Sequence, residues 1–171
     1  VYPVFGHWAW GNKVLPDNDS YLINKGFIDF AGGTVVCALG GWVALAGLLV
    51  IGPRTGKYSE DGKINPMLAN NVVLAGFGAI VIWVGALAFN SGLVHAGSQN
   101  VAHIMSNTIL VGAFSGLTSL VVGRIKDGLF RPERCIYGML GGVAAVAAGC
   151  HIFSVTDTII LGIFSGIMVS F

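Results

Sequence analysis

Charged side chains are scarce in this chain. Only 10% of its 171 residues are Asp, Glu, Lys or Arg, 54% are hydrophobic, and the net charge is +1. A water-soluble domain usually carries about a quarter of charged residues, so a single soluble core is excluded. The low net charge and the lack of a basic patch also argue against a nucleic-acid partner. The composition predicts an integral membrane protein.

Cysteine is scarce as well, and motifs of enzyme active sites are missing. Cys37, Cys135 and Cys150 show no CxxC spacing, and each lies in or beside an apolar run. This pattern predicts buried free thiols rather than disulfides or a zinc site. The chain contains no GxSxG, no HExxH and no recognisable Cys/His nucleophile pair. We therefore expect no enzyme activity, no catalytic residue, no bound metal and no cofactor.

Apolar runs dominate what is present, at about 27–52, 72–94, 101–123, 135–153 and 158–171. A run of about 26 residues crosses a hydrocarbon core of about 30 Å. These runs predict an all-α polytopic membrane protein with a transmembrane helical bundle over 27–171. The last run is short for a span, so we interpret the bundle as incomplete at its C-terminus. Residues 1–26 predict an external aromatic and polar segment after a preceding span.

The positions of lysine and arginine predict the orientation of the bundle. Of the nine such residues, three lie in the loop 53–71 and four in the loop 124–134, whereas the turns 95–100 and 154–157 carry none. By the positive-inside tendency, the two basic loops are cytoplasmic and the two turns are external. The first run then passes from outside to inside.

Glycine is abundant, with 26 residues, and much of it lies inside the apolar runs. Three pairs show small-xxx-small spacing: Gly112/Gly116, Gly138/Gly142 and Gly162/Gly166. In lipid, such spacing lets helix backbones approach closely, so these runs are expected to pack on other helices. The Gly76–Gly78 pair likewise indicates helix packing, not a phosphate-binding loop.

Asp29 is the one carboxylate near the start of the first run. A charge there is costly and marks a structural or functional position. The carboxylate can accept backbone N–H groups in the first helical turns. It can also help to orient a cation, and the two roles are compatible.

Several motifs resemble the ammonium transporter (Amt/Rh) family. They are GHWAWG at 6–11, DFAGGTVV at 29–36 and GGWVALAGLLVIGPRTGKY at 40–58, extended by AFNSG at 88–92, NVAHIMSNTIL at 100–110 and VAAVAAG at 143–149. The resemblance implies an Amt-type bundle of eleven helices in two inverted halves, of which this chain holds the end of the fourth and helices five to nine. It also implies trimers, an external aromatic site for ammonium and an apolar pore lined by two histidines.

The same resemblance implies a site. Asp29, Trp10, Phe89 and Asn90 match substrate-binding positions of the family, with Trp10 at the outer mouth and Phe89 at the pore gate. Three pore-lining positions depart from it: Cys37 stands where the family has a histidine, Ala86 replaces a tryptophan and Leu93 replaces a serine. A thiol is a poor substitute for an imidazole in proton transfer near neutral pH.

Three functions remain open on this evidence. The first is an ammonium-transporter-like membrane protein that recognises or conducts ammonium or ammonia with altered pore residues. The second is a non-transporting ammonium sensor or regulatory subunit on the same scaffold, and the third is a structural subunit of a membrane assembly. The expected partners are ammonium or ammonia, the lipid bilayer of a plasma or inner membrane, and further copies in a homotrimer or larger membrane complex.

Overall fold

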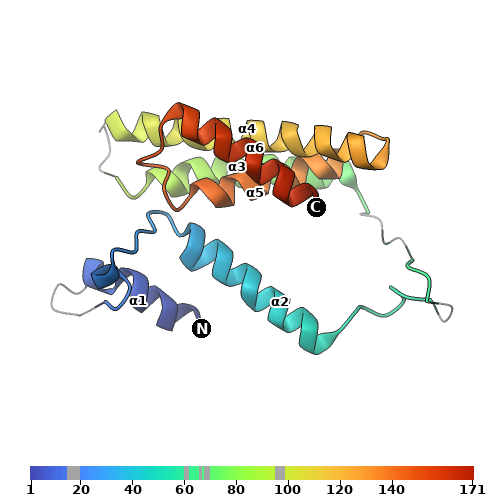
Figure 1. Ribbon diagram of the computed structural model, residues 1–171, viewed down its shortest axis with the longest axis horizontal. Coiled ribbons are helices and arrows are strands. Elements are labelled where there is room, and N and C mark those ends of the chain that lie inside the picture. Colours follow the sequence, from blue (N-terminus) through green and yellow to red (C-terminus); the bar gives the residue numbers. More distant parts are fainter. Residues whose placement is uncertain (15–19, 60–61, 66, 68–69, 95–98) are drawn as a thin grey trace.

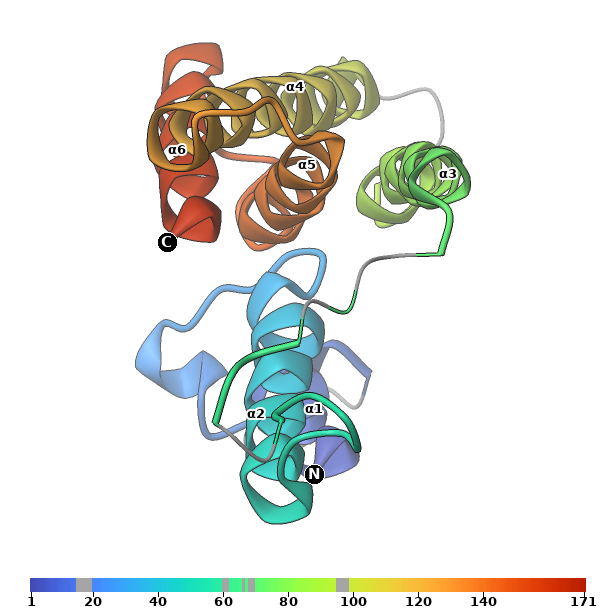
Figure 2. The ribbon, with the colours of Figure 1, turned by 90° about the vertical axis from the view of Figure 1, so that its right-hand side faces the viewer.

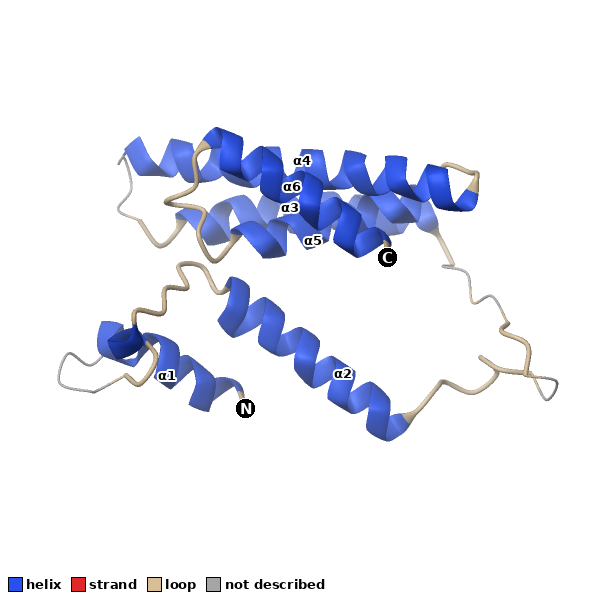
Figure 3. Ribbon diagram, viewed as in Figure 1, coloured by secondary structure: helices blue, strands red, loops and turns tan. Residues whose placement is uncertain are grey.

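The computed structural model describes residues 1–14, 20–59, 62–65, 67, 70–94 and 99–171. All the regular secondary-structure elements assigned within these residues are helical (Figure 3), which confirms the all-α fold class. The α-helices are α1 (Tyr2–Val14), α2 (Leu39–Ile51), α3 (Val72–Ser91), α4 (Gln99–Asp127), α5 (Pro132–Val146) and α6 (Val155–Ser170). A 3₁₀ turn spans Ile23–Lys25, and a π-helix over Gly33–Ala38 leads directly into α2.

Three helical stretches in the described residues are long and apolar enough to cross a membrane: Gly33–Ile51, Val72–Ser91 and Asn100–Asp127. They overlap the first three predicted runs. The first stretch is apolar around its circumference and largely exposed, as expected for a helix whose neighbours are lipid or other helices. α6 is a shorter apolar helix.

Two predicted runs differ from the observed helices at one end. Residues 27–32 are not helical, because the chain turns at Gly32 (φ 85°) before the helix begins at Gly33. The run 135–153 is helical only to Val146, and an irregular turn follows over 147–153. There the carbonyls of Ala147 and Ala148 accept hydrogen bonds from the N–H groups of Ala31 and Phe30, both at 2.9 Å, in place of continued helix bonds.

The helices α3 to α6 lie side by side, and α1 and α2 form a second part of the molecule (Figures 1 and 2). Within the larger part, α4 packs chiefly on α5 and α6 (Figure 2). Glycines permit this approach: a Cβ on Gly142 would lie 2.9 Å from the Val111 carbonyl oxygen, and one on Gly166 would lie 2.5 Å from that of Ser115. The predicted use of glycine in helix packing is confirmed for the three small-xxx-small pairs. It is not confirmed for Gly76–Gly78, because a Cβ on Gly78 would meet nothing within 4 Å.

The buried core joins the two parts. Ala31 packs with Ile104, Val111, Val146 and Cys150, all of which are at most 2% exposed. The segment after Asp29 is therefore fixed against the ends of α4 and α5. This contact places the N-terminal end of the first run near the end of α3, where the candidate site lies.

Candidate functional site

Asp29 is 2% exposed and holds the start of the π-helix. Its Oδ1 accepts the N–H of Gly32 at 3.0 Å, and its Oδ2 accepts those of Thr34 at 2.9 Å and Val35 at 2.7 Å. These N–H groups are among those that the first turn of a helix leaves without partners. The predicted capping role of Asp29 is confirmed, and its role toward a cation remains a prediction.

Trp10 is fixed to the same segment from α1. Its indole Nε1–H donates to the backbone carbonyl of Asp29 at 2.8 Å. The indole donor is thus occupied, and the Trp10 side chain also lines a cavity. Together with the bonds from Phe30 and Ala31 to the turn after α5, this contact holds the segment from both sides.

The first of two cavities lies between α1, this segment and the end of α3. Its volume is about 500 Å³. Its walls are mainly aromatic and aliphatic side chains, supplied by Tyr2, Trp10, Phe30, Ala31, Val36, Phe89 and Leu93. We call it the outer cavity. Three residues singled out from the sequence, Trp10, Phe89 and Leu93, therefore meet in one place.

The second cavity, of about 330 Å³, lies between the π-helix, α3 and α5. We call it the inner cavity. It is lined by Cys37, Ile82, Ala86, Phe89, Asn90, Leu140, Val143, Ala144 and Ala147. It collects the two other predicted pore positions, Cys37 and Ala86. Phe89 belongs to the walls of both cavities.

Asn90 is 1% exposed, and its amide group joins two helices. The Nδ2 donates to the Thr108 hydroxyl of α4 at 3.0 Å, and that hydroxyl donates to the Ile104 carbonyl at 2.8 Å. This chain of bonds ties α3 to α4 behind Phe89. These bonds give Asn90 a structural role between α3 and α4. Its role in substrate binding remains a prediction.

The arrangement favours a small cation or a small neutral molecule. Aromatic faces in the outer cavity attract cations. Among the described residues that line this cavity, Tyr2 alone carries a hydroxyl. The nearby Asp29 carboxylate accepts hydrogen bonds from backbone N–H groups. The inner cavity is apolar apart from the Cys37 thiol and the Asn90 amide, so a bare ion would lose its hydration there without replacement.

Sequence reasoning missed part of each wall. Tyr2, Phe30 and Val36 line the outer cavity, and Val143 and Ala147 line the inner one. Phe30 could have been found, because it adjoins Asp29 in the motif. Val143 on α5 and Ala147 just after it could not, since their approach to Cys37 depends on how α5 packs. In the described part of the chain, no group of three His, Cys, Asp or Glu residues is placed to hold a metal ion.

Comparison with known proteins covers the whole chain. The model of the Ammonium Transporter Family matches residues 1–171. Ammonium transporter Amt2 of Archaeoglobus fulgidus is 31% identical over 176 residues, which cover 100% of this chain and 37% of that protein. Ammonium transporter 1 member 1 of Solanum lycopersicum is 33% identical over 183 residues, covering 98% and 38%.

Solved structures agree with the fold. The Sensor Amt Protein superposes with a TM-score of 0.92 at 36% identity, over 98% of this chain and 41% of that one. Mep2 of Candida albicans gives a TM-score of 0.84 at 27% identity, over 99% and 37%. The chain thus spans a little over a third of the length of these relatives.

Proposed function

Because the chain belongs to the ammonium transporter family, we propose that it recognises ammonium or ammonia at the outer cavity, with conduction altered by its pore residues. The observation that carries this proposal is the position of Phe89 in the walls of both cavities. Residues predicted from separate motifs line the two cavities that share Phe89: Trp10 and Leu93 line the outer cavity, and Cys37 and Ala86 line the inner cavity.

Recognition at the outer cavity would rest on aromatic rings. Trp10, Phe30 and Phe89 line this cavity, and the Phe30 ring also stacks on His151 at a centroid distance of 4.3 Å. The face of an aromatic ring attracts a cation, and a desolvated contact of this kind contributes about 2 kcal/mol. Leu93 adds no acceptor for an ammonium N–H. We therefore expect weak, selective binding in which the rings supply most of the attraction.

Passage through the inner cavity would require the ion to give up a proton or its hydration. Cys37 is the titratable side chain among the residues lining this cavity, and a thiol is a weak donor and acceptor. We infer slower or abolished conduction compared with a pore lined by histidine.

A sensor is the second candidate, and two observations favour it. The Sensor Amt Protein is one of the most similar solved structures, and three pore positions of this chain depart together from the family pattern. A sensor keeps the binding cavity and has no need of rapid conduction. A structural subunit, in which neither binding nor conduction survives, is the third candidate.

We place the protein in a plasma or inner membrane, as a homotrimer or within a larger membrane complex. Membership of the family and the described stretches able to cross a bilayer support this proposal. Size measurement in detergent by light scattering would test the trimer.

The function can be tested with the protein in proteoliposomes. Ammonium pulses should give saturable binding together with ammonia flux that is measurable but much slower than that of a conducting relative. Trp10→Leu should weaken binding several-fold, because it removes one ring from the cavity. Trp42→Leu is the matched control, since Trp42 lies on the exposed face of α2 and lines neither cavity.

The outcomes separate the three candidates. Fast flux that saturates with ammonium would support conduction and overturn the inferred block at the inner cavity. Binding without flux supports the sensor. Absence of both, in a protein that remains folded, would leave the structural subunit.

A further inference from the structure

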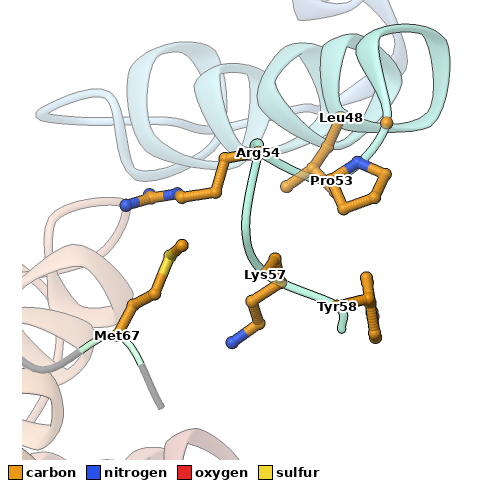
Figure 4. Close-up of a pocket in the computed structure, with 7 residues that line it drawn as sticks. Leu48, Pro53, Arg54, Lys57, Tyr58 and Met67 are labelled. Atoms are coloured by element: carbon orange, nitrogen blue, oxygen red, sulfur yellow. The ribbon is translucent and has the colours of Figure 1, made fainter. Parts of the chain in front are cut away.

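A third cavity lies far from the candidate site, where α2 ends and the chain turns into the loop 52–67 (Figure 4). Its volume is about 440 Å³. Its walls combine apolar side chains with two cations and a phenol: Leu48, Gly52, Pro53, Arg54, Lys57, Tyr58 and Met67. We call it the loop cavity. It shares no lining residue with the outer or inner cavity.

The loop that carries the two cations has a defined backbone. The Lys57 N–H donates to the Arg54 carbonyl at 3.1 Å, which closes a turn, and Gly56 within it has φ 81°. An isolated antiparallel bridge joins Tyr58 to Ile64. Asn65 stabilises the same turn, since its Nδ2 donates to the Gly56 carbonyl at 3.0 Å. The turn therefore holds Arg54 and Lys57 three residues apart on one short segment.

The charges of Arg54 and Lys57 are not neutralised by the described residues. Within the described residues, ion pairs join Arg131 and Arg134 to Asp127, at the other basic loop, 124–134. Glu60 and Asp61, the acidic residues of this loop, lie outside the described residues. In Figure 4 the Arg54 and Lys57 side chains both extend on the side of the loop where Met67 lies.

The position of the cavity defines its surroundings. It adjoins the last turn of α2, in a stretch able to cross a membrane, at the end predicted to be cytoplasmic. The end of such a span lies at the depth of the lipid headgroups. Arginine recognises phosphate through two parallel N–H bonds, and lysine adds a point charge. The walls formed by Leu48, Pro53 and Met67 suit the glycerol ester and first methylenes of a lipid.

We propose that the loop cavity binds the headgroup of an anionic phospholipid of the cytoplasmic leaflet. Arg54 and Lys57 hold the phosphate, and the apolar wall contacts the ester end of the acyl chains. The mixed lining favours a lipid over free phosphate, which has no apolar part to place against Leu48 and Met67. The binding is independent of ammonium, so failure of either proposal leaves the other intact.

Lipid retention by the purified protein tests the site. The protein in detergent is titrated with phosphatidylglycerol and, separately, with phosphatidylcholine, and bound lipid is counted by native mass spectrometry. Each cation near an anionic lipid contributes about five-fold in affinity. We expect Arg54→Gln and Lys57→Gln each to weaken phosphatidylglycerol binding about five-fold, with little change for phosphatidylcholine.

Arg131→Gln is the matched control, because it removes one cation from the other basic loop, where the side chain is 56% exposed. An equal loss in this control, or no loss in either loop-cavity variant, would overturn the proposal. Displacement of the lipid by millimolar inorganic phosphate would also overturn it, in favour of a free anion. If Arg54→Gln fails to fold, Lys57→Gln and the charge-preserving Arg54→Lys still decide the question.

Discussion

A buried carboxylate near the start of a membrane span needs compensation, and Asp29 receives it from the backbone. Three N–H groups converge on its two oxygens within 3.0 Å. The turn that brings them there requires Gly32 at φ 85°, a conformation in which a side chain is strained. The charge is thereby used for local structure, and Trp10 is positioned by the backbone carbonyl of Asp29 rather than by its carboxylate.

Replacement of Asp29 by asparagine should destabilise the protein. The amide nitrogen would face backbone donors, and hydrogen bonds to a charged acceptor contribute about 1.5–3 kcal/mol. We expect Asp29→Asn to lower the free energy of unfolding by about 2 kcal/mol, measured by denaturation in detergent. If this variant kept its stability and lost ammonium binding, a direct contact between Asp29 and the ligand would be indicated instead.

Replacement of Cys37 by histidine tests how far a single residue controls conduction. Cys37→His supplies an imidazole to the inner cavity, but Ala86 and Leu93 remain on either side of Phe89. We expect ammonia flux in proteoliposomes to stay low. Flux at the level of a conducting relative from this one change would show that the outer cavity is not impaired.

At the level of helices, α4 is the element on which the others assemble. Glycines on α5 and α6 bring their backbones against it, and buried hydroxyls bond across the contact. Ser115 donates to the Gly138 carbonyl at 2.6 Å, and Ser119 donates to the Arg134 carbonyl at 2.8 Å. In lipid such close contact replaces the hydrophobic driving force that water provides.

Gly142→Ala should disturb this contact. The new Cβ would lie 2.5 Å from the Ser115 Cβ and 2.9 Å from the Val111 carbonyl oxygen, so α5 must shift. Overpacking of this kind costs about 1–3 kcal/mol. Gly41→Ala on α2 is the control, because its Cβ meets nothing within 4 Å and alanine favours helix. Equal unfolding midpoints for the two variants would contradict the tight α4–α5 contact.

On the scale of the whole molecule, the described residues include three stretches that can cross a membrane, and the chain covers a little over a third of the length of its relatives. The exposed apolar faces of α2 and α3 are consistent with further helices or lipid around them. The orientation inferred from lysine and arginine puts the outer cavity on the external side and the loop cavity on the cytoplasmic side.

Cysteine labelling would test this orientation. In a variant without the three native cysteines, Thr156→Cys should react with an impermeant maleimide added outside cells, and Lys63→Cys should react only after the membrane is opened. Both side chains are exposed in the structure. The reverse pattern would invert the assignment of the two cavities to the two sides.

Much of the fold was predictable because its determinants are local. The lengths of the apolar runs predicted the stretches that can cross a membrane. The spacing of glycines predicted which helices pack closely together. The ends of helices were less predictable. Residues 27–32 and 147–153 lie within predicted apolar runs but are not helical. They pair with each other through Phe30 and Ala31, which is a contact between segments distant in sequence.

The candidate site likewise has features that the sequence predicts and features that depend on tertiary contacts. The sequence by itself determined the membrane class, the family resemblance and the identities of Trp10, Cys37, Ala86, Phe89 and Leu93, because these depend on composition and on motifs. Only the tertiary structure decided that Phe89 belongs to the walls of two cavities, that the Asp29 carboxylate accepts backbone N–H groups, and that Arg54 and Lys57 line a third cavity. Such facts depend on distances between segments, which the order of residues does not specify.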